Sequence, residues 1–284
     1  MIIQPHTEVR SASTTHLREL LRLLRTSERT HHHLDWQNTA GWLQQHPCHV
    51  AFADSIPIGM LSIPVETASA AWLRLATVRD DEPDTSTMTP LWTTAREELQ
   101  QQGVTRAVAL TANVWPERLI PPWGFVPCGH VVVLRREQAP PPPIAKTAAL
   151  IRAATHTDLE AVFRIDQAAF GPMWRYSLRM LDMAVQQANY ATVAYQDNDI
   201  VGYLLATKAN GKMFLARLVV TPEFQDRGIG RTLTLDMLHH FSRGHTPMVE
   251  VNTQESNVAS IALYQALDFE LTGEKAQVWQ CQIN

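Results

Sequence analysis

Hydrophobic residues follow a helical spacing in two places that lie about half a chain apart. In the first half, positions i, i+3, i+4 and i+7 are occupied by Leu17, Leu20, Leu21 and Leu24. In the second half, the same pattern begins with Leu159, Val162 and Phe163. Because this spacing places the side chains on one face of a helix, we expect an amphipathic helix near the start of each half.

Short apolar runs predict strands after each of these helices. In the second half, we expect a hairpin over residues 193–195 and 201–206, and then a strand over 213–220. A helix, a strand over 248–252, a helix over about 257–267 and a last pair of strands follow. This order predicts an α/β (α+β) fold, with a mixed, mostly antiparallel central sheet flanked by helices.

The two halves are related by an internal repeat. Matched pairs of residues include Arg10 and Arg152, Gly59 and Gly202, Arg74 and Arg217, and Phe125 and Phe269. The offset between partners grows from 142 residues at the first pair to 144 at the last. A slowly growing offset is typical of a duplication followed by small insertions, so the chain is expected to contain two copies of one unit.

Four consecutive prolines, Pro140 to Pro143, lie almost at the midpoint of the chain. Proline has no N–H group to donate, and a run of prolines favours an extended spacer. We therefore expect one domain over residues 1–137, a proline-rich linker over 138–147 and a second domain over 148–284.

The composition limits the class of protein and of partner. The chain has 284 residues, of which 45% are hydrophobic and 18% charged, and its formal net charge is −4. No basic stripe is present, so we expect neither a nucleic acid nor a membrane as the partner. The apolar runs are short, and the first residues lack the features of a signal peptide, so we expect no membrane span and no leader.

Cysteine and histidine residues do not predict a metal site. Cys48, Cys128 and Cys281 are widely spaced and odd in number, so we expect reduced thiols in a cytoplasmic protein. The segment His31-His32-His33 is consecutive, and neighbouring residues on a helix or strand point in different directions. We expect these histidines to lie on a solvated surface and to bind no metal ion.

A glycine-rich segment, residues 225–231, follows the strand expected over 213–220. It reads Gln-Asp-Arg-Gly-Ile-Gly-Arg, and a helix with an apolar face comes next. Glycine allows the backbone to turn tightly and to approach a ligand closely. The N–H groups at the start of a helix suit a phosphate or pyrophosphate. The segment lacks the Lys-Ser/Thr of a P-loop and the third glycine of a dinucleotide-binding loop.

Two motifs in this half resemble those of a known family. The stretch from Leu218 to Leu233 is similar to the acetyl-CoA signature of the GNAT superfamily, Q/R-x-x-G-x-G/A after a central strand. The stretch from Asn257 to Phe269 resembles the second motif, N-x-x-A-x-x-L-Y-x-x-x-G-F, with Asp268 at the glycine position. Aspartate tolerates a left-handed conformation, so we expect this turn to form. The resemblance implies two tandem GNAT-like folds and an acetyl-CoA-dependent N-acetyltransferase.

The resemblance also implies roles for individual residues, in a reaction where an amine attacks the thioester of acetyl-CoA in a ternary complex. The strand backbone that would pair with the pantetheine arm belongs to Leu218, Val219 and Val220. The amides that would hold the pyrophosphate belong to Gln225, Asp226, Arg227, Gly228, Ile229, Gly230 and Arg231. Asn257 would fix the pantetheine. Tyr264 would protonate the CoA sulfur, and packing of its ring is the alternative. Glu250 is the candidate base, and a surface glutamate is the alternative.

The first half lacks these features at the corresponding positions. Its loop over residues 82–87 reads Glu-Pro-Asp-Thr-Ser-Thr, with two carboxylates, a proline and no glycine. Ile120 corresponds to Tyr264 and cannot transfer a proton. Carboxylates repel pyrophosphate, so we expect the first domain to be a degenerate GNAT-like domain without a phosphate loop. The tandem layout is similar to that of the mycothiol synthase family.

No motif identifies the acyl acceptor. Candidate residues for an acceptor site are Phe170, Trp174 and Tyr176, with Trp36 and Trp42 in the matching region of the first half. We expect the acceptor to be a primary amine of a small molecule. The alternatives are a protein N-terminal or lysine amine, or a non-catalytic module that senses CoA or binds a partner. Two units in one chain form a pseudo-dimer, so we expect a monomer or a weak homodimer.

Overall fold

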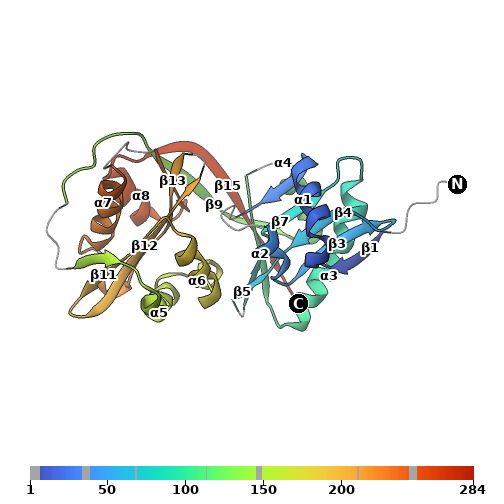
Figure 1. Cartoon of the computed structure of the whole chain (residues 1–284), viewed down its shortest axis with the longest axis horizontal. Coiled ribbons are helices and arrows are strands. Elements are labelled where there is room, and N and C mark those ends of the chain that lie inside the picture. Colours follow the sequence, from blue (N-terminus) through green and yellow to red (C-terminus); the bar gives the residue numbers. More distant parts are fainter. Residues whose placement is uncertain are drawn as a thin grey trace. The chain divides into compact units, whose positions relative to one another are not determined.

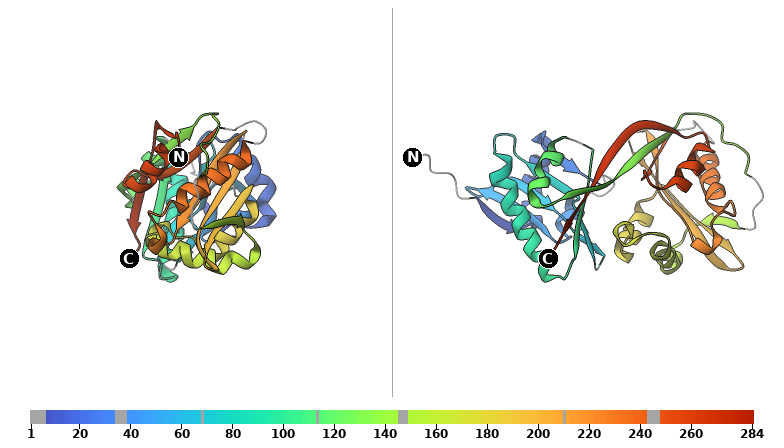
Figure 2. Two further views of the ribbon diagram at one scale, coloured as in Figure 1. Left: turned by 90° about the vertical axis from the view of Figure 1, so that its left-hand side faces the viewer. Right: turned by 180° about the vertical axis from the view of Figure 1, so that it is seen from behind.

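The computed structural model describes residues 7–33, 39–67, 69–112, 114–144, 149–209, 211–242 and 248–284. The chain forms two compact units, which can be followed by colour in Figures 1 and 2. Unit 1 comprises Met1–Cys128 and Ala276–Asn284, and unit 2 comprises Gly129–Lys275. This division differs from the ranges 1–137 and 148–284, because each unit includes a strand segment from the other half of the sequence.

Unit 2 contains a mixed sheet with helices on both faces. Its strands are β9 (Val126–Arg136), β10 (Leu150–Ala153), β11 (Tyr190–Gln196), β12 (Asp199–Ala209), β13 (Lys212–Val220) and β14 (Val249–Gln254). Their order is β10-β11-β12-β13-β14-β9, and β13 and β14 form a parallel pair among antiparallel neighbours. The strands expected over 193–195, 201–206, 213–220 and 248–252 are thereby confirmed.

The helices of unit 2 bury two separate apolar clusters against this sheet. They are α5 (Leu159–Ala169), α6 (Leu178–Gln187), α7 (Ile229–Phe241) and α8 (Val258–Gln265), with short turns η3 (His156–Asp158), η4 (Pro172–Trp174) and η5 (Pro222–Phe224). Helices α5 and α6 cover one face, and α7 and α8 cover the other (Figure 1). The predicted apolar face of α5 is confirmed, since Val162 and Ile165 are buried.

Unit 1 repeats this arrangement with a divided sheet. Its strands are β1 (Glu8–Ser11), β2 (Thr30–His32), β3 (Cys48–Ala53), β4 (Ile56–Ser62), β5 (Val65–Thr67), β6 (Ala70–Trp72), β7 (Leu75–Val78), β8 (Arg106–Thr111) and the end of β15 (Glu270–Gln282). Its helices are α1 (Leu17–Thr26), α2 (Thr39–Leu43), α3 (Asp84–Gln101) and α4 (Val114–Leu119), with turns η1 (Thr14–His16) and η2 (Pro121–Trp123). The strand orders are β1-β3-β4-β7-β2 and β15-β8-β6-β5.

The repeat extends to details of the backbone. Strands β1-β3-β4-β7 correspond in order to β10-β11-β12-β13. Each unit has a two-residue hairpin turn in which both residues have positive φ, at Asp54 and Ser55 and at Asp197 and Asn198. Such turns match the right-handed twist of the strands that they join. The predicted repeat and the predicted α/β (α+β) fold are therefore confirmed.

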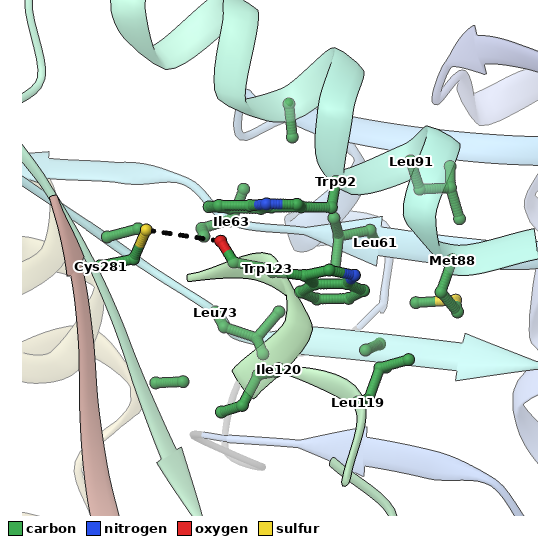
Figure 3. Packing of buried hydrophobic residues seen from close by; sticks show 14 of the residues in the cluster. Leu61, Ile63, Leu73, Met88, Leu91, Trp92, Leu119, Ile120, Trp123 and Cys281 are labelled. Atoms are coloured by element: carbon green, nitrogen blue, oxygen red, sulfur yellow. Dashed lines mark hydrogen bonds between the residues drawn. The ribbon is translucent and has the colours of Figure 1, made fainter. Parts of the chain in front are cut away.

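The last strand of each half completes the unit of the other half. In unit 2, β9 pairs with β14 from Val131↔Gln254 to Arg136↔Val249. In unit 1, the end of β15 pairs with β8. Cys281 of β15 packs in the core beside the stacked rings of Trp92 and Trp123, where its Sγ donates to the Trp123 carbonyl at 3.6 Å (Figure 3).

Arg136 of β9 holds several parts of unit 2 together. Its side chain is only 1% exposed. It donates from Nε to the Leu267 carbonyl at 3.0 Å, from Nη1 to Ala139 at 2.8 Å and from Nη2 to Pro140 at 3.1 Å. The chain after α8 and the proline segment are thus both tied to β9. At the turn after α8, Asp268 has a φ of 62°, which confirms the left-handed turn expected there.

The structure corrects the expectation for the consecutive histidines. His31 lies in β2 and is 4% exposed, so its expected place on a solvated surface is wrong; pairing of β2 with β7 buries it. The three cysteines are free thiols, with Cys48 and Cys281 buried. No helix within the described residues is long and apolar enough to cross a membrane.

The exchanged strands predict which fragments fold. A fragment of residues 144–284 lacks β9 and therefore exposes the edge of β14 and removes the Arg136 hydrogen bonds. We expect it to be insoluble or to unfold without cooperativity, whereas residues 129–275 should be soluble and melt cooperatively. Soluble yield and thermal unfolding of both fragments test this, and equal behaviour of the two would contradict it.

Candidate functional site

A pocket of about 410 Å³ lies in unit 2, where the end of β13 meets the starts of α7 and α8. All of the predicted cofactor-binding residues except Arg227 line it. Ala169 and Phe170, at the end of α5, also belong to its wall. Three segments that are distant in the sequence therefore meet at one cavity.

The open edge of β13 is the first element of the pocket. The ladder between β13 and β14 runs from Met213↔Val249 to Leu215↔Val251, and the two strands diverge beyond it. On its other side, β13 stays paired with β12 as far as Val220.

The direction of the N–H groups on this edge follows from one hydrogen bond. The Thr221 N–H donates to the Val201 carbonyl of β12 at 2.9 Å. Because N–H groups alternate sides along an antiparallel strand, those of Leu218 and Val220 point into the pocket. An extended chain can add to such an edge as a further strand.

The glycine loop forms the second element. Gly228 has a φ of 78° and caps α7, and its carbonyl accepts from the Thr232 N–H at 2.9 Å. A Cβ on Gly230 would lie 3.4 Å from Leu263 of α8, so this glycine allows close packing of the two helices. The first N–H groups of α7 have no intrahelical acceptors and carry the positive end of its dipole, which suits a phosphate.

Arg227 and Asn257 occupy different positions relative to the pocket. The guanidinium of Arg227 lies over the Phe224 ring, 4.9 Å from its centroid, and does not line the pocket. Asn257 lines the pocket, and its Oδ1 accepts from the Ser260 N–H at 3.2 Å. This cap directs the start of α8 toward the cavity.

Tyr264 lies one residue beyond the pocket-lining Leu263. Its side chain is 4% exposed and packs on Phe269, with ring centroids 5.6 Å apart. Burial raises the pKa of Tyr264 above its ordinary value. The phenol therefore stays protonated at neutral pH, and its position is compatible with packing and with proton donation.

Glu250 lies on β14 in an ion-pair cluster instead of the pocket wall. Its carboxylate accepts from Arg135 at 2.8 Å and from Lys212 at 3.1 Å. Burial raises the pKa of Glu250, but the hydrogen bonds from Lys212 and Arg135 outweigh it, and the pKa is lowered overall. A carboxylate stabilised in this way is a weak base. Both partners were missed, because the sequence does not show that Arg135 of the exchanged strand β9 and Lys212 at the start of β13 lie beside Glu250.

The candidate acceptor residues divide into two groups. Phe170 lines the pocket, whereas Trp174 and Tyr176 lie behind its wall, where all three contact Arg217. In unit 1, Trp42 is fully buried and belongs to the core. Trp36 lies outside the described residues.

Comparison with known proteins agrees with this geometry. Residues 157–269 match the family model for the acetyltransferase (GNAT) family. The second half of the chain therefore contains a GNAT acetyltransferase domain. The solved structure of a tandem GNAT protein from the clavulanic acid biosynthesis pathway is similar over 98% of this chain and 99% of that chain, with a TM-score of 0.68 and 16% identity. At this identity, the likeness concerns the fold alone.

Two curated relatives match parts of the chain. The [ribosomal protein bS18]-alanine N-acetyltransferase of Escherichia coli (strain K12) is 24% identical over 113 residues, which cover 40% of this chain and 75% of that protein. The mycothiol acetyltransferase of Thermobifida fusca is 42% identical over 52 residues, which cover 18% of this chain and 16% of that protein.

In unit 1, strand β2 covers the edge of β7, which corresponds to the open edge of β13 in unit 2. Gly59 pairs with Val78 as Gly202 pairs with Val220, so Val78 corresponds in register to Val220. Strand β2 lies along this edge, with His31 opposite Ala76, and the Val78 N–H donates to the Arg29 carbonyl at 3.2 Å. The chain itself thus supplies the extra strand.

The loop of unit 1 that corresponds to the glycine loop binds a cation of the same chain. The guanidinium of Arg29 donates to Asp84 at 2.5 Å and to the carbonyls of Arg79 and Glu82 at 2.6 and 2.9 Å. Oxygen atoms, rather than N–H groups, therefore point into this loop. This supports the expectation that unit 1 has no phosphate site.

Replacing Gly228 with valine should abolish acetyl-CoA binding by the GNAT domain. A β-branched residue is strained at a φ of 78°, and the loop would lose the shape that directs its N–H groups to the pocket. Gly103→Val is the matched control, because Gly103 has a φ of 72° and no heavy atom within 4 Å of an added Cβ. Calorimetry should show binding only in the control, and binding by both would contradict the assignment of the loop.

Replacing Glu250 with glutamine should lower stability in a pH-dependent way. A lowered pKa in the folded state contributes stability above the pKa of an unfolded glutamate, and the contribution is lost as the pH falls through the folded value. We expect a loss of about 1–2 kcal/mol in the free energy of unfolding at pH 7, with a smaller difference in acid. Glu274→Gln, the exposed partner of Arg135, is the control. A loss that is equal at all pH values would contradict the ion-pair explanation.

Proposed function

We propose that unit 2 transfers an acetyl group from acetyl-CoA to a primary amine, by direct attack in a ternary complex. The observation that carries this proposal is the meeting of an open strand edge, a helix N-terminus and Asn257 at one pocket. A pantetheine arm needs strand-like partners, and a pyrophosphate needs N–H donors. The pocket offers both along one line, and the GNAT family membership agrees with it.

In this proposal, the residues of the chain bind and orient the donor and move one proton. The N–H groups of Leu218 and Val220 hold the pantetheine, and those at the start of α7 hold the pyrophosphate. A neutral amine nitrogen forms a bond to the thioester carbon, the carbon–sulfur bond breaks, and the departing sulfur accepts a proton from Tyr264. The nitrogen loses one proton to solvent as the amide forms, and Tyr264 takes a proton back from solvent. Burial keeps the phenol protonated before the thiolate forms, and it also weakens the phenol as an acid, because it disfavours the tyrosinate that donation leaves.

We propose a small-molecule amine as the acceptor. A protein α-amine is the second candidate, which the similarity to the bS18-alanine N-acetyltransferase favours. A thiol-release assay with small primary amines and with peptides that begin with alanine separates the two. Binding of acetyl-CoA without turnover of either class would favour a non-catalytic module.

Tyr264→Phe should lower turnover by about 10- to 1,000-fold, which is the usual range for one general acid. The ring and its contact with Phe269 are retained, so stability and acetyl-CoA affinity should change little. Steady-state rates, together with the dissociation constant of acetyl-CoA, check this. Wild-type turnover in the variant would assign Tyr264 to packing.

Acetyl-CoA should bind with a stoichiometry near one per chain and protect only one of the two corresponding strand edges. Hydrogen exchange at Leu218 and Val220 should slow when acetyl-CoA is added, because their N–H groups gain acceptors. Exchange at Ala76 and Val78 should be slow already and should not change, because β2 covers them. Slowing at both edges, or a stoichiometry near two, would show a second site in unit 1.

A further inference from the structure

A buried ion pair stands directly behind the wall of the pocket. Arg217 of β13 is 9% exposed, and Asp166 of α5 is fully buried. The Arg217 Nε donates to Asp166 Oδ2 at 2.6 Å, and the Tyr203 hydroxyl donates to the same oxygen at 2.6 Å. Three elements of unit 2 are thereby joined at one carboxylate.

The same pair fixes the segment of residues 170–177 between α5 and α6. The Arg217 Nη2 donates to the Trp174 carbonyl at 2.8 Å. Its guanidinium carbon lies 3.9 Å from the ring centroid of Phe170 and 3.7 Å from that of Tyr176. Asp166 Oδ1 accepts from the Tyr176 N–H at 3.0 Å. The beginning, middle and end of the segment are therefore all attached to the ion pair.

Stability alone is a weak explanation for this arrangement. A buried ion pair loses hydration on folding, and well-packed apolar residues often give equal or greater stability. A planar guanidinium, however, can stack on rings and donate hydrogen bonds in fixed directions at the same time. This geometry determines where Phe170 lies, and Phe170 is the part of the segment that faces the pocket.

The wall formed by Phe170 borders the edge of β13 along Leu218 to Val220, the residues that follow Arg217. An acceptor that attacks a thioester held along this edge must be oriented by the neighbouring wall. We propose that Arg217 is a positioning residue, which holds the 170–177 segment as the acceptor-side wall of the pocket through Asp166. This inference rests on the proposed acetyl transfer.

Two substitutions separate positioning from stability. Arg217→Met removes the charge and leaves Asp166 buried without a cationic partner, with only the hydrogen bonds from Tyr203 and Tyr176. Arg217→Lys keeps a charge for Asp166, but an ammonium group cannot also stack between two rings and reach the Trp174 carbonyl. We expect Arg217→Met to lose thermal stability and Arg217→Lys to retain most of it. Neither variant should hold the 170–177 segment in place.

Arg74→Lys in unit 1 is the matched control. Arg74 is 2% exposed, pairs with Glu66 at 2.5 Å and lies 4.8 Å from the Trp72 ring centroid. It resembles Arg217 in burial and in contacts, and it belongs to the unit in which β2 covers the corresponding strand edge. Its substitution should therefore cost similar stability without a change in the pocket of unit 2.

The experiment measures hydrogen exchange over residues 170–177, the dissociation constant of acetyl-CoA, and rates with n-butylamine and with a peptide that begins with alanine. In Arg217→Lys, we expect faster exchange in the segment, unchanged acetyl-CoA affinity, and an amine KM raised by about 10- to 100-fold with a smaller change in kcat. Arg74→Lys should change none of these.

The proposal would be overturned if hydrogen exchange over residues 170–177 were unchanged in Arg217→Lys. It would also be overturned if this variant kept both the wild-type amine KM and the wild-type thermal stability. The exchange measurement needs no acceptor. If the wild-type protein acetylates neither amine, the proposed reaction fails for these acceptors, and exchange in the segment still decides whether Arg217 holds it.

Discussion

The divergence of two parallel strands is the constraint on which both units depend. In unit 2, the ladder between β13 and β14 ends at Leu215↔Val251, while β12 stays paired with β13 as far as Val220. The backbone groups beyond the ladder need partners, because unpaired N–H and C=O groups away from water cost free energy. Unit 2 leaves this edge open toward a pocket. In unit 1, β2 pairs with the corresponding edge of β7, so the backbone groups there have partners within the chain.

The loops after the two strands have opposite electrostatic character. In unit 2, Gly228 and Gly230 allow helix N–H groups to face the pocket, and an anion is the ligand that suits them. In unit 1, carbonyl and carboxylate oxygens surround the guanidinium of Arg29. Covering the strand edge and reversing the loop polarity each disfavour acetyl-CoA. Both changes arise within one segment of unit 1, because Arg29 directly precedes β2.

The sequence predicted the features that depend on local patterns. The repeat, the glycine loop and the left-handed turn at Asp268 all follow from spacing and residue type. The order of the strands in the sheet could not be predicted, because apolar periodicity does not show which strands lie side by side. The ion pairs of Glu250 were missed for this reason. The match of Arg74 with Arg217 was also wrong in register: Ser62 pairs with Leu75 where Leu205 pairs with Arg217. The difference arises because 13 positions separate Ser62 from Leu75 (75 − 62) and 12 separate Leu205 from Arg217 (217 − 205).

The exchanged strands give a physical reason why unit 1 accompanies the GNAT domain. Strand β9 follows unit 1 directly in the chain, yet its residues 131–136 close the sheet of unit 2 beside β14. Arg135 pairs with Glu250, and Arg136 holds the Leu267 carbonyl just after the helix that carries Tyr264. A sheet that lacked β9 would expose β14 and release the end of α8. Loss of the phosphate loop in unit 1 therefore does not make unit 1 dispensable, since the chain that leaves it supports the pocket of unit 2.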